Sequence, residues 1–120
     1  MEEKIRLIQY EGKNILHLDF SNCKAEEILD TISKAKKVIA TYPEQSLLTL
    51  TDVTGARFND EVTQEMKAFT THNRPYVRAG AVVGVTGLKR IIFQAVVAFS
   101  GRKLSAFDSV EQAKKWLVEH

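Results

Sequence analysis

Apolar and polar residues alternate along the first part of the chain. Residues 4–10 and 15–20 both follow this pattern, and Leu16, Leu18 and Phe20 share one side of the second stretch. Period-two alternation is typical of β-strands. Because a short turn with a glycine separates the two stretches, we expect an antiparallel hairpin.

Further along the chain, apolar residues recur every three or four positions, which is the spacing of amphipathic helices. Four segments have this spacing: residues 25–39, 60–72, 88–100 and 110–117. Three more apolar runs lie between them, at residues 47–53, 76–85 and 104–107. The middle run is almost continuously apolar, as a central parallel strand covered on both faces requires.

Side chains before the helical segments predict where these helices begin. We expect Ser21 or Asn22 to cap the first helix and Asn59 the second. Asp108 and Glu111 have the spacing of a capping box before the last helix.

The predicted element order is β-β-α-β-α-β-α-β-α. Such alternation favours an α/β fold with right-handed crossovers between parallel strands. We expect a five-stranded mixed sheet, antiparallel only in the N-terminal hairpin and covered by four helices. The length of 120 residues suits one domain over residues 1–120.

Composition narrows the classes of function. The chain carries 17 basic and 15 acidic residues, a net charge of +2, which lacks the basic excess of a nucleic-acid binder. Cys23 is the only cysteine, so no intrachain disulfide can form, and a lone thiol suits a reducing cytosol. The sequence shows neither a signal peptide nor an apolar membrane span. We therefore expect a cytoplasmic protein without membrane insertion.

The stretch LLTLTDVTGARFNDE, residues 47–61, is the first candidate site. In open α/β sheets, binding sites form at the carboxyl ends of strands. The candidate partner-binding residues follow such an end: Asp52, Thr54, Asn59, Asp60 and Glu61. Turn chemistry is the alternative interpretation, because aspartate and threonine often bond turn backbone and asparagine caps helices.

A second candidate lies where the fourth strand passes into the third helix. Free N–H groups at a helix start attract anions. Ligand- or anion-binding candidates are Gly84, Thr86, Gly87, Lys89 and Arg90. The glycines match neither a dinucleotide fingerprint nor a P-loop, so a tight turn that needs small residues is the alternative.

The third predicted helix is apolar on more than one side. Phe93 and Val97 lie four residues apart on its second face. This face predicts a homodimer contact, the floor of a ligand pocket, or burial by the chain itself. We favour the homodimer, because an exposed apolar patch is unusual on a monomer.

Catalytic and cofactor motifs are missing from the sequence. His17, His72 and His120 are not at metal-ligand spacing, and no Gly-x-Ser-x-Gly nucleophile elbow occurs. The sequence therefore predicts neither a metal nor a cofactor, and an enzyme of unknown class is the last alternative.

The order of elements and several short motifs resemble the SpoIIAA-like (STAS/CRAL-TRIO-like) family of small bacterial proteins. The motifs are TDVTGARFNDE at residues 51–61, NRPYV at 73–77, VVGVTGL at 82–88, and the ending AFD to WL at 106–117. The resemblance covers nearly the whole chain and implies a STAS-like fold. It also implies a regulatory, protein-binding role rather than catalysis.

The resemblance also directs attention to the start of the second helix. In anti-sigma-factor antagonists of this fold, a partner kinase phosphorylates a serine there that follows an aspartate. Asp60 matches the aspartate, but Glu61 stands in the position of the serine. We therefore expect a partner-docking module without the phosphoserine. The lipid-binding CRAL-TRIO relatives make a small apolar ligand the alternative.

Overall fold

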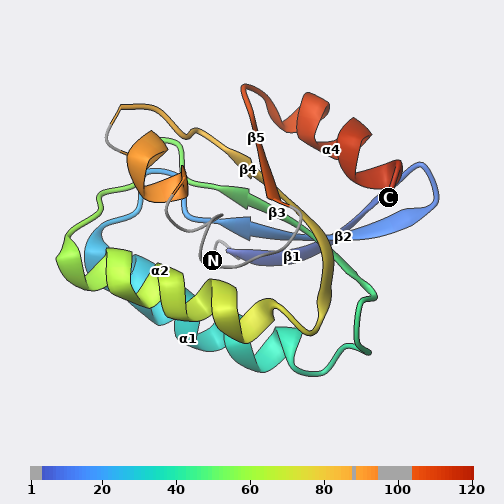
Figure 1. The fold of residues 1–120 in the computed structure, drawn as a ribbon, viewed down its shortest axis with the longest axis horizontal. Helices are drawn as coiled ribbons and strands as arrows, with labels where there is room; N and C mark the ends of the chain where they lie inside the picture. The colour runs from blue at the N-terminus through green and yellow to red at the C-terminus, as the bar shows by residue number, and fades with distance from the viewer. Residues whose placement is uncertain (1–3, 88, 95–103) are drawn as a thin grey trace.

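A five-stranded mixed sheet forms the centre of the fold (Figure 1). The computed structural model describes residues 4–87, 89–94 and 104–120. The strands are β1 (Ile5–Tyr10), β2 (Lys13–Asp19), β3 (Leu47–Asp52), β4 (Val77–Val83) and β5 (Leu104–Phe107). They lie in the order β1-β2-β3-β4-β5, with β1 antiparallel to β2 and all other pairs parallel. The predicted hairpin and mixed sheet are confirmed.

Four helices accompany this sheet, as the apolar spacing predicted. α1 (Ala25–Ile39) and α2 (Asp60–Asn73) lie side by side on one face, and α4 (Val110–Val118) covers the other (Figure 1). Of the third predicted helix, residues 89–94 are described and helical. Leu88 and Val97 lie outside the described residues. Among the described residues, no helix is long and apolar enough to cross a bilayer.

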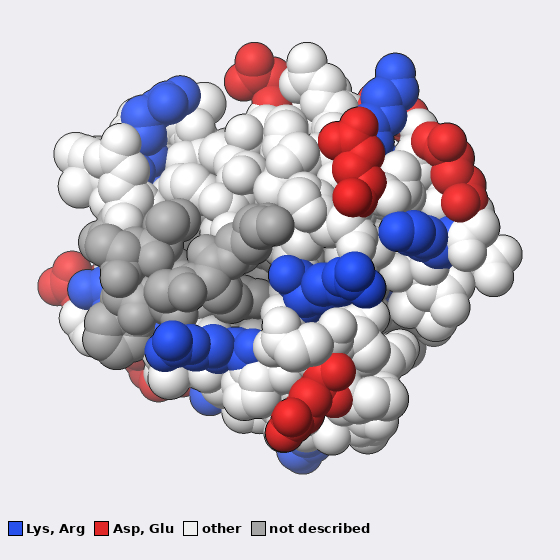
Figure 2. Space-filling view, turned by 45° about the vertical axis from the view of Figure 1, so that its right-hand side comes forward, with Lys and Arg blue, Asp and Glu red and all other residues white. Residues whose placement is uncertain are grey.

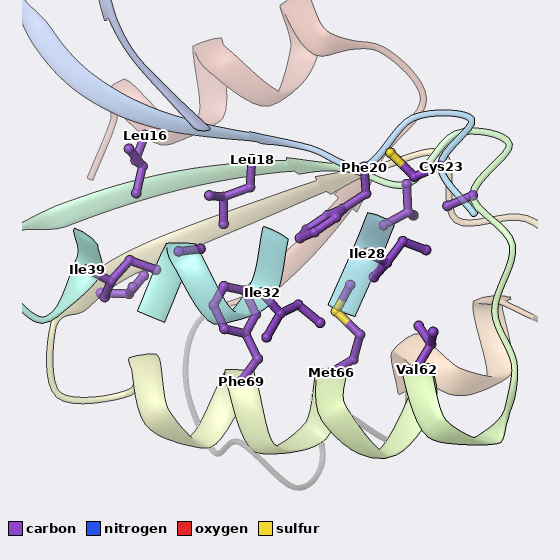
Figure 3. Packing of buried hydrophobic residues seen from close by; sticks show 14 of the residues in the cluster. Leu16, Leu18, Phe20, Cys23, Ile28, Ile32, Ile39, Val62, Met66 and Phe69 are labelled. Carbon is purple, nitrogen blue, oxygen red and sulfur yellow. The ribbon is translucent and has the colours of Figure 1, made fainter. Parts of the chain in front are cut away.

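Each inner strand contributes to two hydrophobic cores, because successive side chains point to opposite faces. Leu16 and Leu18 of β2 point towards α1 and α2, whereas Ile15 packs with Leu48 and Leu50 against α4. Figure 3 shows the first core, in which side chains of the sheet meet those of both helices: Leu16, Leu18, Phe20, Ile28, Ile32, Met66 and Phe69. On β3, Leu48 and Leu50 face α4, whereas Thr49 and Thr51 lie on the opposite face.

Two of the three predicted caps differ from the observed ones. Asn59 caps α2 as expected, since its side-chain oxygen accepts the Val62 backbone N–H at 2.8 Å. The prediction for α1 was wrong: Lys24 is the N-cap, and its backbone N–H donates to the Glu27 carboxylate at 3.0 Å. Ser21 and Asn22 belong to the preceding loop, which has its own hydrogen bonds.

The capping box predicted for the last helix was also wrong. Ser109 caps α4, because its hydroxyl accepts the Gln112 backbone N–H at 3.2 Å. Serine is among the favoured N-cap residues, and it lies one position after Asp108. The helix thus begins one residue later than the capping box of Asp108 and Glu111 requires.

Candidate functional site

Three loops meet at the edge of the sheet where β2, β3 and β4 end. We call residues 20–24, 53–59 and 84–87 the carboxyl-edge loops. Backbone hydrogen bonds join them: Asn22 N–H donates to the Thr54 carbonyl at 2.8 Å, and Val53 N–H to the Val83 carbonyl at 2.9 Å. Arg57 N–H donates to the Cys23 carbonyl at 3.0 Å. The β-sheet pairing therefore continues into loops that hold one another in place.

Two glycines allow these loops to approach so closely. Gly84 has a φ of +89°, and a Cβ there would lie 2.5 Å from the Thr54 backbone nitrogen. Gly55 has a φ of +68°, and a Cβ there would lie 2.3 Å from the Asn22 side-chain oxygen. Both the left-handed backbone and the missing side chain are needed at these positions. For Gly84, this supports the tight-turn interpretation of the sequence.

Four of the five predicted partner-binding residues lie exposed on this edge. Thr54 and Asn59 belong to the loop after β3, and Asp60 and Glu61 form the first turn of α2. Negative side chains at this place complement the positive end of the helix dipole. The edge therefore presents an acidic corner, defined here as Asp60 and Glu61.

Asp52 is separate from that corner. Its strand neighbours in register are Asp19 and Val83, so its carboxylate lies on the α4 face, opposite to α2. Its Oδ1 accepts the Thr54 backbone N–H at 2.9 Å, which is the turn chemistry considered above. Asp52 thus shapes the loop that carries Thr54 but does not face the same direction as Asp60.

A charged cluster that sequence reasoning missed surrounds Asp52 on the α4 face. Arg6 of β1 reaches His17 Nδ1 at 3.0 Å and the Asp19 carboxylate at 3.6 Å. Ser21 donates to Asp19 through its backbone N–H at 3.0 Å and through its hydroxyl. The sequence could have shown that His17 and Asp19 share one face of their strand, because they lie two residues apart. The contribution of Arg6 depends on the hairpin register, which the alternating pattern alone does not give.

The cluster lowers the pKa values of His17 and Asp19 on β2. Burial lowers the pKa of His17, and the nearby Arg6 charge lowers it further. Burial alone would raise the pKa of Asp19, but hydrogen bonds from Ser21 and the charges of His17 and Arg6 hold it below its ordinary value. His17 Nε2 is buried and has no hydrogen-bond partner in the described ranges. These shifts favour a neutral imidazole beside an ionised carboxylate.

The predicted anion-binding residues after β4 do not act as one group. Lys89 turns inward, and its ammonium donates to the Val53 carbonyl at 3.0 Å. Thr86, Gly87 and Arg90 are exposed, while Gly84 packs on Thr54. The inward turn of Lys89 separates its charge from that of Arg90.

A pocket of about 80 Å³ lies between the sheet, α2 and helical residues 89–94. Its walls are mostly apolar, with Met66 and Phe69 from α2 and Ile92 and Phe93 from the helical segment. The polar lining residues are Thr49, Thr51, Thr70, Asn73 and Lys89. No carboxylate belongs to the described lining.

Phe93 belongs to the wall of this pocket. It is partly buried, packs against the first core and lines the pocket, which fits the pocket-floor alternative. The exposed apolar residue of this segment is Ile91, with 65% of its surface accessible. Val97 lies outside the described residues, so the two-residue contact with Phe93 remains a prediction.

Figure 2 shows basic and acidic side chains interspersed on one face, without a continuous basic stripe over its described part. In residues 4–87, 89–94 and 104–120, no three His, Cys, Asp or Glu side chains come together as metal ligands do.

Comparisons with known proteins reveal the fold. No family model and no curated protein match the sequence. Among solved structures, an uncharacterised protein of the DUF3478 family with a SpoIIAA-like fold, from Shewanella loihica PV-4, matches with a TM-score of 0.72 at 14% identity, over 94% of this chain and 91% of that one. An anti-sigma-factor antagonist (STAS) domain protein from Planctomyces limnophilus matches with a TM-score of 0.63 at 12% identity, over 95% and 97%. The chain has the SpoIIAA-like, or STAS, fold.

Proposed function

We propose that this chain is a non-enzymatic regulatory module that docks a partner protein on its carboxyl-edge loops and the acidic corner. The observation that carries the proposal is the set of hydrogen bonds that joins the loops of this edge. Hydrogen bonds between loops and the close approach of Gly84 to Thr54 join the loop backbones without any partner. A preformed surface loses less conformational entropy on association than a mobile one.

The acidic corner defines the chemistry of such a partner. Asp60 and Glu61 are both exposed, and the structure pairs neither with a basic side chain in its described part. Their unpaired charges favour a partner with a basic docking surface. Because both side chains end in a carboxylate, this corner presents negative charge without phosphorylation.

Affinity capture from the source cytosol tests the docking surface. The double variant Asp60→Lys, Glu61→Lys reverses the charge of the corner, and we expect it to lose the specific partner that the unaltered chain retains. The matched control is Glu44→Lys, Glu119→Lys, which makes the same charge change at exposed positions outside the carboxyl-edge loops. Equal capture by both double variants would exclude the acidic corner as the docking surface.

The pocket supports a second candidate function, a carrier of a small, mostly apolar ligand. Pockets for small molecules are typically apolar with a few convergent polar groups, and this one has that composition. Native mass spectrometry of freshly purified protein would detect a co-purifying molecule as a mass adduct. The substitution Phe69→Trp, which fills the pocket, should abolish the adduct. An adduct that persists in this variant would place the ligand elsewhere.

A further inference from the structure

The outer edge of β1 pairs with no other strand among the described residues. β1 ends the strand order of the sheet, and its register is with β2 alone. Leu7 lies in the middle of β1, opposite the buried Leu16 and on the same face of the sheet. The core that covers Leu16 ends before Leu7, which keeps 50% of its surface exposed. This edge therefore combines strand backbone with an exposed apolar side chain.

Alternate residues of β1 direct their backbone groups away from β2. In an antiparallel pair, directly opposite residues exchange either both hydrogen bonds or none. The hairpin register continues to Lys4 and Asp19, and the Lys4 carbonyl accepts the Asp19 N–H at 2.7 Å. The even-numbered residues of β1 therefore bond to β2. The N–H and C=O groups of Ile5, Leu7 and Gln9 point outwards, and these three residues are spaced evenly about Leu7.

β1 lacks the features that usually prevent edge strands from pairing, such as prolines, bulges and outward-facing charges. Its six residues contain no proline, and their register with β2 is unbroken. Its one charged side chain, Arg6, is held over β2 by contacts with His17 Nδ1 at 3.0 Å and with the Asp19 carboxylate at 3.6 Å. The edge can therefore accept another strand.

We propose that β1 pairs antiparallel with β1 of a second copy of this chain, about a two-fold axis that passes beside Leu7 and perpendicular to the sheet. This axis matches every outward donor of one copy with an acceptor of the other, because Leu7 meets its own equivalent and Ile5 meets Gln9. Arg6 then lies opposite Ile8, so no like charges of β1 face each other. This self-complementary register favours a second copy over an unrelated strand.

Sedimentation velocity over a concentration series tests the proposal. Because a single pair of strands is a small interface, we expect a reversible monomer–dimer equilibrium between about 10 µM and about 1 mM protein. Leu7→Lys and Leu7→Glu each place like charges opposite each other at the axis, and each should weaken dimerisation about fivefold or more. An equimolar mixture of the two variants should restore association, since opposite charges then face each other.

Ala106→Lys is the matched control, because it adds the same charge at an exposed position of β5, the other edge of the sheet. This variant should dimerise like the unaltered chain. An unaltered chain that stays monomeric throughout the series, equal dimerisation of Leu7→Lys and Ala106→Lys, or a mixture no more associated than its components would each overturn the proposal.

Amide exchange distinguishes a second copy from a different occupant of this edge. We expect the amides of Ile5, Leu7 and Gln9 to exchange more slowly at high than at low protein concentration. Protection of these amides only in complex with another protein would assign the edge to a strand of that protein and overturn the second copy. The contact involves none of the carboxyl-edge loops, so its failure would leave the proposed docking surface standing.

Discussion

Single residues determine how closely the carboxyl-edge loops pack. Gly84 is the tightest of them, because its position lies against the backbone of Thr54 rather than against a movable side-chain end. Gly12 has a similar φ of +79°, but a Cβ there would have no neighbour within 4 Å. Substitutions at these two glycines can therefore distinguish the cost of backbone strain from the cost of a steric clash.

We expect Gly84→Ala to lower the free energy of unfolding by about 3 kcal/mol or more, since it combines left-handed strain with overpacking. Gly12→Ala should cost only about 1–2 kcal/mol, from the strain alone. Urea denaturation of both variants measures the difference. Equal losses would mean that the approach of the β4 loop to Thr54 is not under steric constraint.

The cluster around His17 predicts how stability depends on pH. Because the folded state lowers the pKa of His17, the unfolded chain binds the proton more readily. Stability is therefore complete above the unfolded pKa of about 6.5 and declines as pH falls through that value towards the folded pKa. Asp19 adds a loss at more acidic pH, since its folded pKa is also lowered.

Charged groups on the neighbouring elements affect the pKa of His17. Arg6 and Lys114 disfavour the imidazolium, whereas Asp19 and Asp52 favour it.

The variant His17→Asn tests this assignment, because asparagine offers an oxygen in place of Nδ1 but does not titrate. Urea denaturation between pH 7.5 and pH 5 should show a smaller decline for this variant than for the unaltered chain. Identical pH profiles would contradict the assignment to His17.

At the scale of elements, the start of α2 holds the acidic corner in place. Asn59 satisfies the Val62 N–H, and its carbonyl accepts the Thr63 N–H at 3.0 Å. Asn59→Ala should lower the free energy of unfolding by about 1 kcal/mol, whereas Asn59→Asp, which keeps an acceptor, should cost little. Chemical denaturation followed by circular dichroism measures the free energy of unfolding of both variants. A loss in Asn59→Asp as large as in Asn59→Ala would argue against the side-chain cap.

Local patterns explain why the elements themselves could be predicted. The alternation around Leu16 and Leu18 and the helical spacing after Ala25 depend only on neighbouring positions in the sequence. The N-cap residues were harder to predict, because several polar residues precede α1 and α4. Which of them caps the helix depends on where the preceding loop ends. Lys24 has no typical capping side chain, so its position was not visible in the sequence.

At the scale of the whole molecule, the sites depend on register and on packing between distant segments. The parity of Asp52 with Leu48 and Leu50 could have placed its carboxylate on the α4 face. In contrast, the inward turn of Lys89 follows from how residues 89–94 meet the sheet. Sequence reasoning thus identified the end of the sheet where the candidate residues lie. It did not predict which of these residues lie on the α4 face and which on the α2 face.

The central claim is that a partner docks on the carboxyl-edge loops and the acidic corner. Amide hydrogen exchange of the captured complex, compared with the free chain, tests it most directly. We predict that the partner slows exchange in residues 53–61 and 84–87 and leaves α4 unchanged. Slowed exchange confined to α4 or to the β1 edge, with residues 53–61 unaffected, would contradict the account.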